Sequence, residues 1–363
     1  MKKVGIIYLF WSDEPLRYLD AALSGISAQT YNRADISLYI VYNSQRPNEA
    51  SSLEYIEHLV NERQADLPNT IILSPEKNLG FSGGNNMGVK AALMDGCDYI
   101  LLGNADLVFE AKAVSELVAA MESDKTIGQA QAFVLLDPER ELINTSGNIW
   151  HYSGIGYCGD YRQSAENCTK RGVYDIGYVS GAASMLRADL LNKYGLWSED
   201  FFMYHEDTEY SLRLKLRGYR LAAVRSAMCY HTYQLSKNLQ KYYWLVRNSE
   251  ILKYLVYKWP TLILLLPLDI VYHLGLVFVS IWGGWFKELV KVYTYLLTPS
   301  NWVKWREIRR KNLKERVLTD RQILAASGRT VTMAKSFVGT GVAMVVNIVF
   351  AVYYFCLRLL VWW

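Results

Sequence analysis

Residues 4–42 read VGIIYLFWSDEPLRYLDAALSGISAQTYNRADISLYIVY. The stretch opens with an uninterrupted apolar run, Val4 to Phe10, and closes with a second run, Ile36 to Tyr42, that is apolar except for Ser37. Continuous apolar runs of this length are typical of strands that are buried on both faces of a parallel sheet. Between the two runs, leucine and isoleucine recur at helical spacing from Leu16 to Gln29. The order strand, helix, strand therefore predicts a parallel βαβ unit.

The same alternation continues toward residue 121. We expect helices over 51–63, 88–94 and 111–121, and strands over 70–73 and 99–102. This order predicts an α/β fold in which helices flank a mostly parallel sheet. Ligands in such folds bind at the carboxyl ends of the strands, and polar residues follow several of the predicted strands.

The next part of the chain is less periodic. Residues 130–175 combine polar stretches with glycines and aromatics, which predicts irregular loops with short strands. A helix is expected from Met185 to Tyr194, ended by Gly195. The apolar run from Leu221 to Tyr230 predicts a further strand.

The composition sets limits on partners and compartment. The chain has 363 residues, of which 51% are hydrophobic, and a net charge of +4, which gives no reason to expect nucleic acid as a partner. Length suggests two units or one large domain. The 5 cysteines show no CxxC pair and no zinc-finger spacing, which fits reduced thiols in the cytosol. The first apolar run is too short to span a membrane and reads as a strand rather than a signal peptide.

Two polar motifs follow predicted strands. The first, Lys77 to Gly88 (KNLGFSGGNNMG), is rich in glycine and opens a helix. Such a loop lets backbone N–H groups approach a phosphate, although a plain glycine-rich turn is an equally good interpretation. The second is Asn104-Ala105-Asp106. Its carboxylate can hold a divalent ion that bridges a diphosphate, or it can cap a helix.

The third motif lies between Val179 and His231. An aromatic cluster, Phe201 to Tyr204, stands directly before the acids Glu206, Asp207 and Glu209. Burial against aromatics and mutual repulsion raise the pKa of a carboxyl group, as a general base requires. The alternative is the solvated first turn of a helix, where acids are favoured by the helix dipole.

These motifs in this order resemble glycosyltransferase family 2, the inverting enzymes with the GT-A fold. The likeness is greatest to the rhamnosyltransferase-like and galactofuranosyltransferase-like branch, and it covers roughly residues 1–260. The pattern N-x-G-F-x-x-G-x-N begins at Asn78, a strand ends in N-x-D at Asp106, and FFxYxED ends at Asp207. A histidine, His231, completes the pattern.

The resemblance implies a role for each matching residue. Asp207 is expected to be the catalytic base, with Glu206 as its catalytic neighbour. Asp106 and His231 are expected to hold Mg²⁺ or Mn²⁺. The expected donor contacts are Tyr42, Asn43, Asn78, Gly80, Phe81, Gly83, Gly84, Asn85, Asn86, Asn104, Asp106 and Arg247. The expected acceptor contacts are Gly181, Phe202, Tyr204 and Glu206.

Two of these positions depart from the family or allow another interpretation. Many relatives carry an aspartate that contacts the base where this chain has Tyr42, so Tyr42 is expected to stack on the base instead. Arg247 lies in the run YYWLVRN. It can pair with a phosphate, or it can be an arginine whose stem lies along an apolar membrane interface.

The implied function is transfer of a sugar from a nucleotide-diphosphate donor, such as dTDP-rhamnose or a UDP-sugar. The acceptor is expected to be a hydroxyl of a lipid-linked glycan, in the assembly of a cell-surface polysaccharide. One alternative is a polyprenyl-phosphate sugar synthase, which has less need of a general base. The other is a non-catalytic membrane scaffold on a transferase fold, which the set Asp106, Asp207 and His231 disfavours.

The resemblance and the apolar segments together predict three regions. Residues 1–240 form the GT-A catalytic domain, 241–335 form interfacial or re-entrant helices with a basic cytoplasmic loop, and 336–363 form a transmembrane helix. The segment 261–286 contains Pro267, Asp269 and His273, which are unfavourable inside a straight transmembrane helix. We therefore expect a re-entrant or interfacial hairpin there.

The span itself is expected from Ser336 to Leu357, with membrane lipids as partners. The basic loop then places the catalytic domain on the cytoplasmic face of the plasma membrane. Two spans joined by an external loop are the alternative.

Overall fold

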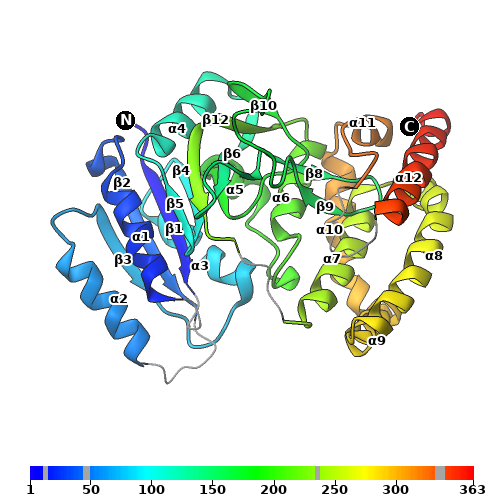
Figure 1. Ribbon diagram of the computed structural model, residues 1–363, viewed down its shortest axis with the longest axis horizontal. Helices are drawn as coiled ribbons and strands as arrows, with labels where there is room; N and C mark the ends of the chain where they lie inside the picture. Colours follow the sequence, from blue (N-terminus) through cyan, green and yellow to red (C-terminus); the bar gives the residue numbers. More distant parts are fainter. Residues whose placement is uncertain (11–14, 44–49, 234–237, 332–339) are drawn as a thin grey trace. The chain divides into compact units, whose positions relative to one another are not determined.

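The computed structural model describes residues 1–10, 15–43, 50–233, 238–331 and 340–363. The chain forms two compact units (Figure 1). The first contains residues 1–148, 158–211 and 220–234, and the second contains residues 149–157, 212–219 and 235–363. Two short internal segments therefore belong with the C-terminal helices, which a single boundary at residue 240 does not describe.

A ten-stranded mixed sheet is the centre of the first unit, in the order β10-β12-β6-β11-β4-β1-β2-β3, with β5 on β12 and β7 on β6. Its strands are β1 (Val4–Phe10), β2 (Ile36–Tyr42), β3 (Asn69–Leu73), β4 (Tyr99–Asn104), β5 (Leu107–Phe109), β6 (Ile127–Leu136), β7 (Ile143–Thr145), β10 (Val173–Asp175), β11 (Ala183–Arg187) and β12 (Arg220–His231). The strands β3, β2, β1 and β4 are mutually parallel, as predicted. Strand β11 runs antiparallel between β4 and β6.

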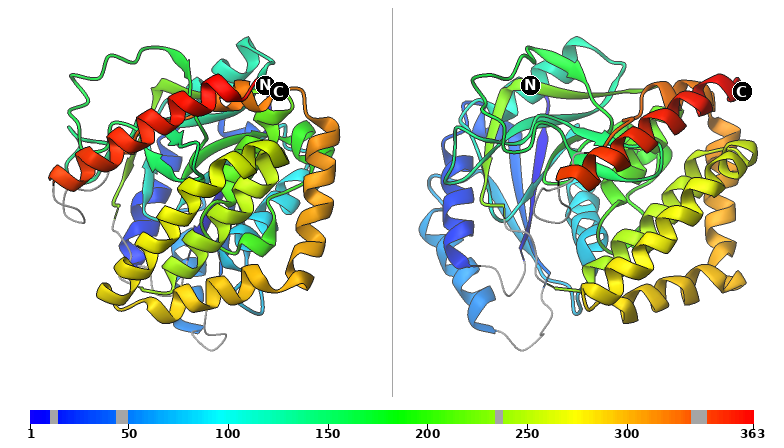
Figure 2. Two further views of the ribbon diagram at one scale, coloured as in Figure 1. Left: turned by 90° about the vertical axis from the view of Figure 1, so that its right-hand side faces the viewer. Right: turned by 45° about the vertical axis from the view of Figure 1, so that its right-hand side comes forward.

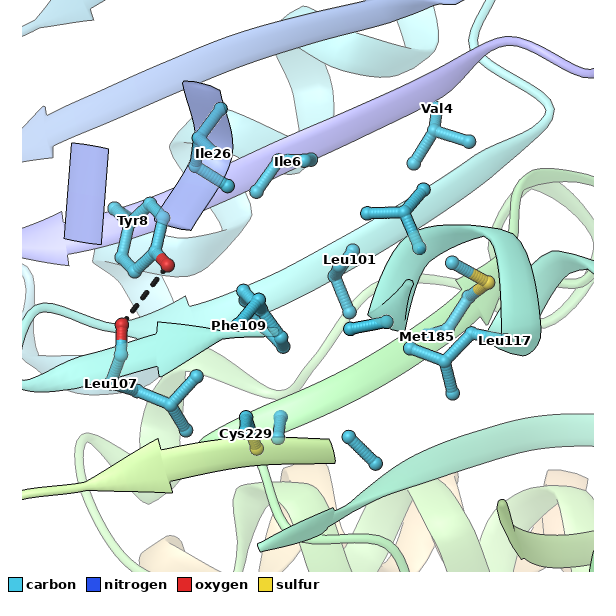
Figure 3. Close-up of a cluster of buried hydrophobic side chains, with 14 of the residues drawn as sticks. Val4, Ile6, Tyr8, Ile26, Leu101, Leu107, Phe109, Leu117, Met185 and Cys229 are labelled. Atoms are coloured by element: carbon cyan, nitrogen blue, oxygen red, sulfur yellow. Dashed lines mark hydrogen bonds between the residues drawn. The ribbon is translucent and has the colours of Figure 1, made fainter. Parts of the chain in front are cut away.

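Helices cover both faces of this sheet. They are α1 (Leu16–Ser27), α2 (Ala50–Glu62), α3 (Gly80–Met94), α4 (Ala113–Ser123), α5 (Ala188–Tyr194) and the first half of α6 (Glu206–Leu216). Because successive residues of a strand point to opposite faces, Ile6 and Tyr8 of β1 join the core under α1 and α4 (Figure 3). The Tyr8 hydroxyl donates to the carbonyl of Leu107 at 3.0 Å. Ile7 faces α3 instead, where a Cβ on Gly88 would lie 2.6 Å from it.

Three predicted elements differ from the structure. The helix expected over 88–94 already begins at Gly80, so the glycines lie inside α3. The segment 130–175 is not irregular throughout, because β6 is a buried strand of 10 residues. Met185 lies in strand β11, and α5 starts only at Ala188. Gly195 does end that helix, with φ of 89°.

The second unit consists mainly of helices. They are α7 (Lys241–Val256), α8 (Trp259–Trp282), α9 (Phe286–Leu297), α10 (Trp302–Glu315), α11 (Asp320–Ala325) and α12 (Thr340–Leu360). A small two-stranded sheet consists of β8 (Asn148–Trp150) and β9 (Gly156–Cys158). Helix α9 packs against both α7 and α8 (Figure 2). Helix α7 was expected to lie in a membrane interface, but Ile251, Leu252 and Leu255 are buried within the unit.

The hairpin expected within 261–286 is not formed. Helix α8 is continuous for 24 residues and passes through Pro267, and the chain turns at Gly283 and Gly284. The polar residues that argued against a straight helix have partners. Asp269 lies 2.6 Å from the ammonium of Lys253, and His273 lies 3.4 Å from Glu250. Paired in this way, the two side chains no longer require a break in the helix.

Two helical segments of the described residues, Trp259–Trp282 and Ala343–Leu360, are long and apolar enough to cross a membrane by length and composition. Their outward side chains are apolar, with Phe278 and Phe355 more than half exposed. Residues 336–339, where the predicted span begins, lie outside the described residues. Membrane crossing by either helix stays a prediction.

Candidate active site

Asp106 and His231 lie together, as the sequence predicted. Asp106 follows β4, and His231 is the last residue of β12, which pairs with β5 directly after Asp106. The His231 Nε2 atom is 3.1 Å from Asp106 Oδ1. The backbone also joins the two strand ends, because the N–H of Thr232 donates to the carbonyl of Asp106 at 3.0 Å.

The hydrogen bond on the other side of the His231 ring bears on a metal ion. Nδ1 lies 3.2 Å from the amide oxygen of Asn144, in the orientation that the structure gives this amide. With the amide in this orientation Nδ1 donates, and Nε2 either shares a proton with Asp106 Oδ1 or faces it with a lone pair. Two acceptors 3.1 Å apart need a cation or a proton between them. A metal-bound histidine typically donates its second N–H to an oxygen in this way.

The donor set fits a divalent cation that is shared with a substrate. Two ligands in neighbouring positions of an octahedral ion stand about 3 Å apart when each bond is about 2.1 Å. No cluster of three or more His, Cys, Asp or Glu side chains suited to a metal occurs among the described residues. Asp106 and His231 can therefore supply two ligands, and Mg²⁺ or Mn²⁺ would need further oxygens from a phosphate or water.

Asp207 is held by three hydrogen bonds at the start of α6. Its Oδ2 accepts from the N–H of Gly181 at 2.9 Å. Its Oδ1 accepts from the N–H of Thr208 at 2.6 Å and from the Thr208 hydroxyl at 3.0 Å. Each carboxylate oxygen can accept twice, so Oδ2 keeps the capacity to accept from a further hydroxyl.

Glu206 and Asp207 form a buried acid pair with unequal surroundings. Burial raises the pKa of Glu206 well above its ordinary 4.5, and the charge of Asp207 adds to the rise. Burial also raises the pKa of Asp207, while the hydrogen bonds from Gly181 and Thr208 oppose the rise. Glu206 Oε2 has no hydrogen-bond partner in the described part of the chain. Glu206 is therefore the carboxyl that keeps a proton, and Asp207 is the one that carries charge.

The backbone before this pair adopts an unfavourable conformation. Phe202, Tyr204 and His205 have φ of 61°, 64° and 69°, which side-chain-bearing residues rarely adopt. Such strain persists where surrounding contacts impose it and is frequent at functional sites. One such contact is visible, because the carbonyl of Phe202 accepts from the N–H of Ser82 at 3.1 Å. Gly80 fits against Phe202 only without a side chain, since a Cβ would lie 2.5 Å from the Phe202 carbonyl.

The loop before α3 is held by asparagines. Asn43 is fully buried and accepts from the N–H of Leu79 at 2.9 Å. Its amide also donates to the carbonyl of Gly80 at 3.0 Å, and Asn78 accepts from the N–H of Gly80 at 2.8 Å. The N–H groups of Leu79, Gly80 and Ser82 thus have protein acceptors. The expectation that this helix start binds a phosphate with its backbone stays a prediction.

The remaining residues of the glycine-rich stretch serve packing in this structure. Gly83 and Gly84 lie inside α3, where a Cβ on Gly84 would lie 2.5 Å from Leu9. Asn85 donates to the carbonyl of Phe81 at 2.9 Å, and the buried Asn86 donates to the carbonyl of Trp197 at 2.9 Å. Each of these amides therefore already has a protein partner. Their expected donor contacts stay predictions.

Gly181 and Ala182 connect the two clusters. The N–H of Gly181 binds Asp207, and the carbonyl of Ala182 accepts from the N–H of Asn104 at 3.2 Å. A Cβ on Gly181 would lie 2.9 Å from Trp197 and 3.0 Å from Phe81, whose rings stack with centroids 5.9 Å apart. The acid pair and the Asn104–Asp106 turn are therefore parts of one site.

Two expected donor contacts have an unpaired polar atom. The Tyr42 side chain is buried and stacks on Phe10, and its hydroxyl finds no partner in the ranges that the structure describes. The amide oxygen of Asn104 is likewise buried without one among those residues. Buried polar atoms without partners are rare in folded proteins and are frequently completed by a ligand or water.

Arg247 belongs to the second unit, so its predicted contact with the donor stays a prediction. It is buried in α7, with its guanidinium over the rings of Tyr243, Trp244 and Tyr295 at 4.5–5.5 Å. It also donates to the amide oxygen of Asn248 at 2.9 Å. Only 4% of Arg247 is exposed, which does not fit the interpretation of this residue as an arginine at a membrane interface.

Sequence reasoning missed three residues of the site. Asn144 fixes the His231 ring, Trp197 covers Gly181, and Glu199 accepts from Asn86 at 3.1 Å. Asn144 lies in the segment that was expected to be irregular, and its place depends on how β7 pairs with β6. No local sequence pattern predicts the pairing of β7 with β6.

Comparisons with known proteins show the family and the fold of this chain. The family model described as "Glycosyl transferase family group 2" matches residues 99–362. The poly-beta-1,6-N-acetyl-D-glucosamine synthase of Staphylococcus aureus is 24% identical over 62% of this chain and 49% of its own length. The low-salt glycan biosynthesis hexosyltransferase Agl10 of Haloferax volcanii is 25% identical over 38% of this chain and 44% of its own length. The chain spans about half the length of the curated relatives it matches.

A solved structure shows the fold. The crystal structure of GalNAc-T7 with UDP, GalNAc and Mn²⁺ superposes with a TM-score of 0.52, covering 69% of this chain and 48% of that one at 17% identity. At this identity the likeness concerns the fold alone. The first unit therefore has the GT-A fold that the sequence predicted.

Proposed function

The chain belongs to glycosyl transferase family group 2, and from this membership we propose that it moves a sugar from a nucleotide-diphosphate donor to a hydroxyl of a lipid-linked glycan. The named products of two relatives are glycans, one of them a polymer of N-acetylglucosamine. A UDP-sugar or a dTDP-rhamnose-like donor follows from the family resemblance. The transfer inverts the anomeric carbon.

One observation supports the proposal most strongly: the adjacent residues Gly181 and Ala182 connect the cluster around Asp207 to the cluster around Asp106. Gly181 binds the carboxylate of Asp207, and Ala182 binds the backbone of Asn104, two residues before Asp106. A base and a diphosphate-binding carboxylate held by adjacent residues suit a reaction in which a hydroxyl attacks while a diphosphate leaves.

Asp207 acts as the general base in this proposal. Its Oδ2 removes the proton of the attacking hydroxyl as the new glycosidic bond forms. Gly181 and Thr208 hold the carboxylate so that this oxygen keeps one orientation. Glu206 retains its own proton, so it leaves the negative charge on Asp207 and can donate a hydrogen bond to the acceptor.

Asp106 and His231 would hold Mg²⁺ or Mn²⁺ beside the donor diphosphate. When bound, the cation neutralises the charge that develops on the departing diphosphate. Asn144 keeps the His231 ring in the tautomer that presents Nε2 to this position. The fold neighbour was crystallised with UDP and Mn²⁺, and we extend these ligand classes to this chain as part of the proposal.

We further place the enzyme at the cytoplasmic face of the plasma membrane. Helices α8 and α12 are apolar on their exposed sides, and the segment 287–316 is rich in lysine and arginine. Basic segments beside apolar ones mark the cytoplasmic face, where nucleotide sugars are made. This placement of the catalytic domain requires that α8 lies along the membrane surface, because a crossing by α8 would put the basic segment and the catalytic domain on opposite sides. Membrane lipids and a lipid-linked acceptor are the partners that fit this location.

A donor panel tests the function. Purified full-length protein is incubated with individual nucleotide sugars and Mn²⁺, and release of the nucleoside diphosphate is measured. We expect turnover of one donor or a small related group. A folded protein that neither binds nor consumes any nucleotide sugar in the panel contradicts the proposal.

A further inference from the structure

Residues of helices α7, α8 and α9 of the second unit line a pocket of about 520 Å³. Figure 2 shows how these three helices lie beside one another. Its residues play no part in the mechanism above. Its polar lining is Glu250, Asp269, His273 and Tyr293, and its apolar lining is Leu266, Ile270, Leu274 and Val277. Concave sites with an apolar wall and a few convergent polar groups are the usual form of ligand pockets.

The polar wall is a connected network of ionisable groups. The ammonium of Lys253 lies 2.6 Å from Asp269 and 2.8 Å from Glu250, and only 2% of this lysine side chain is exposed. His273 lies 3.4 Å from Glu250 through Nε2 and 3.3 Å from the Tyr293 hydroxyl through Nδ1. Among the described residues of this network, the two carboxylates share one ammonium, that of Lys253, so no lysine or arginine is left to bind an anion.

The apolar wall continues along α8. Leu266, Ile270 and Leu274 are each more than half exposed, and they stand on one side of a helix that is apolar enough to cross a membrane. A hydrocarbon chain laid on these residues would cover aliphatic surface that is otherwise exposed. The pocket therefore combines a hydrogen-bonding end and a hydrocarbon-binding side.

We propose that this pocket binds a neutral glycolipid, with the sugar hydroxyls on Glu250, Asp269, His273 and Tyr293 and the chain along α8. Hydroxyl groups both donate and accept, so they match carboxylates and the imidazole and phenol groups together. An ammonium head group only donates and leaves His273 and Tyr293 without a matching acceptor. A phosphate head group meets two carboxylates and no available cation, which disfavours it by repulsion and desolvation.

This inference goes beyond the proposed transfer reaction. It rests on residues of the second unit only, so it is tested independently of the roles of Asp106 and Asp207. Its consequence is that a glycolipid, whether substrate, product or bulk lipid, has a defined binding position on the membrane-associated helices.

Three probes with the same dodecyl chain and different head groups test the proposal. Full-length protein in a polyoxyethylene detergent is titrated with dodecyl maltoside, dodecylammonium or dodecyl phosphate, and bound probe is counted by native mass spectrometry. We expect one tightly held dodecyl maltoside, with binding about tenfold weaker for each charged probe. Equal or tighter binding of a charged probe overturns the assignment of the head group.

Matched substitutions on α8 test the location. Leu274→Trp fills the pocket, whereas Val271→Trp adds the same ring at a position that is 65% exposed and does not line it. We expect Leu274→Trp to weaken dodecyl maltoside binding at least about tenfold and Val271→Trp to leave it unchanged. Leu266→Trp is a second blocking variant, and thermal unfolding checks that each variant is folded. Retained binding in both blocking variants, or equal loss in Val271→Trp, contradicts the proposal.

Discussion

Two clusters of buried ionisable side chains, one in each unit, are built in opposite ways. In the second unit, Lys253 lies between Glu250 and Asp269, so opposite charges meet at 2.6–2.8 Å. In the first unit, Glu206 and Asp207 stand side by side without a lysine or arginine partner in the described part of the chain. Burial lowers the pKa of the adjacent His205 to about 4, so that ring supplies no compensating charge at neutral pH.

The difference separates a stabilising arrangement from a reactive one. A cluster of paired opposite charges holds helices together, so removing one of its charges should lower the stability of the fold. An uncompensated acid pair beside strained backbone adds nothing to stability, and its persistence points to chemistry. Substitutions should therefore affect activity in the first unit and stability in the second.

The largest expected effect is on activity at the cation site of the first unit. Asp106→Asn should lower Mn²⁺-dependent turnover on the order of 10³-fold, because a bound cation contributes several kcal/mol to the leaving group. The free energy of unfolding should change by less than about 1 kcal/mol, since the Asp106 side chain is 20% exposed. Binding of Mn²⁺ in the presence of UDP, followed by electron paramagnetic resonance, should weaken in parallel. Full turnover of wild-type protein in excess EDTA contradicts this role.

The second effect is on stability in the second unit. Lys253→Met should destabilise the fold by about 3–5 kcal/mol, because it leaves two buried carboxylates without their cation. The double variant Lys253→Met/Asp269→Asn should recover part of that loss. Lys291→Met is a matched control, since Lys291 also pairs with an acid three residues away but is 59% exposed. Chemical unfolding measures all three, and equal losses for Lys253→Met and Lys291→Met would remove the contrast.

The smallest effect concerns the pH dependence of stability. Folded Glu206 keeps its proton above pH 4.5, where the unfolded chain releases it, so the folded state binds more protons. Stability from this group is complete below pH 4.5 and declines as the pH rises toward the folded-state pKa. Glu206→Gln should flatten that decline, whereas Glu57→Gln on the exposed face of α2 should not. Unfolding between pH 5 and pH 8 tests this, and parallel curves for wild type and Glu206→Gln count against the raised pKa.

Local pattern was enough for some elements of the fold and not for others. Strands β1 and β2 were correctly bounded because their runs are apolar except for Ser37. Strand β6 was missed because Gln129 and Gln131 interrupt its pattern, although both are fully buried. Their amides bind Ser184 and the backbone of Ser180, partners far away in the sequence. A buried polar residue with a distant partner looks like a surface residue to any local rule.

The glycines of α3 show the same limit. Glycine is a poor helix former, so a loop was the natural prediction before residue 88. The structure makes Gly84 and Gly88 helical because Leu9 and Ile7 leave no room for a Cβ. The pairing of Asp106 with His231 was expected from the family resemblance, whereas the place of Asn144 depends on strand register and was not expected.

The central claim is that Asp207 is the base of a glycosyl transfer, and one measurement tests it most directly. Purified wild-type and Asp207→Asn proteins are compared for donor binding and for sugar transfer with the donor that the panel identifies. The account predicts unchanged donor affinity and unfolding temperature, with transfer reduced on the order of 10²–10⁴-fold. Transfer by Asp207→Asn at a rate near that of the wild type would contradict it.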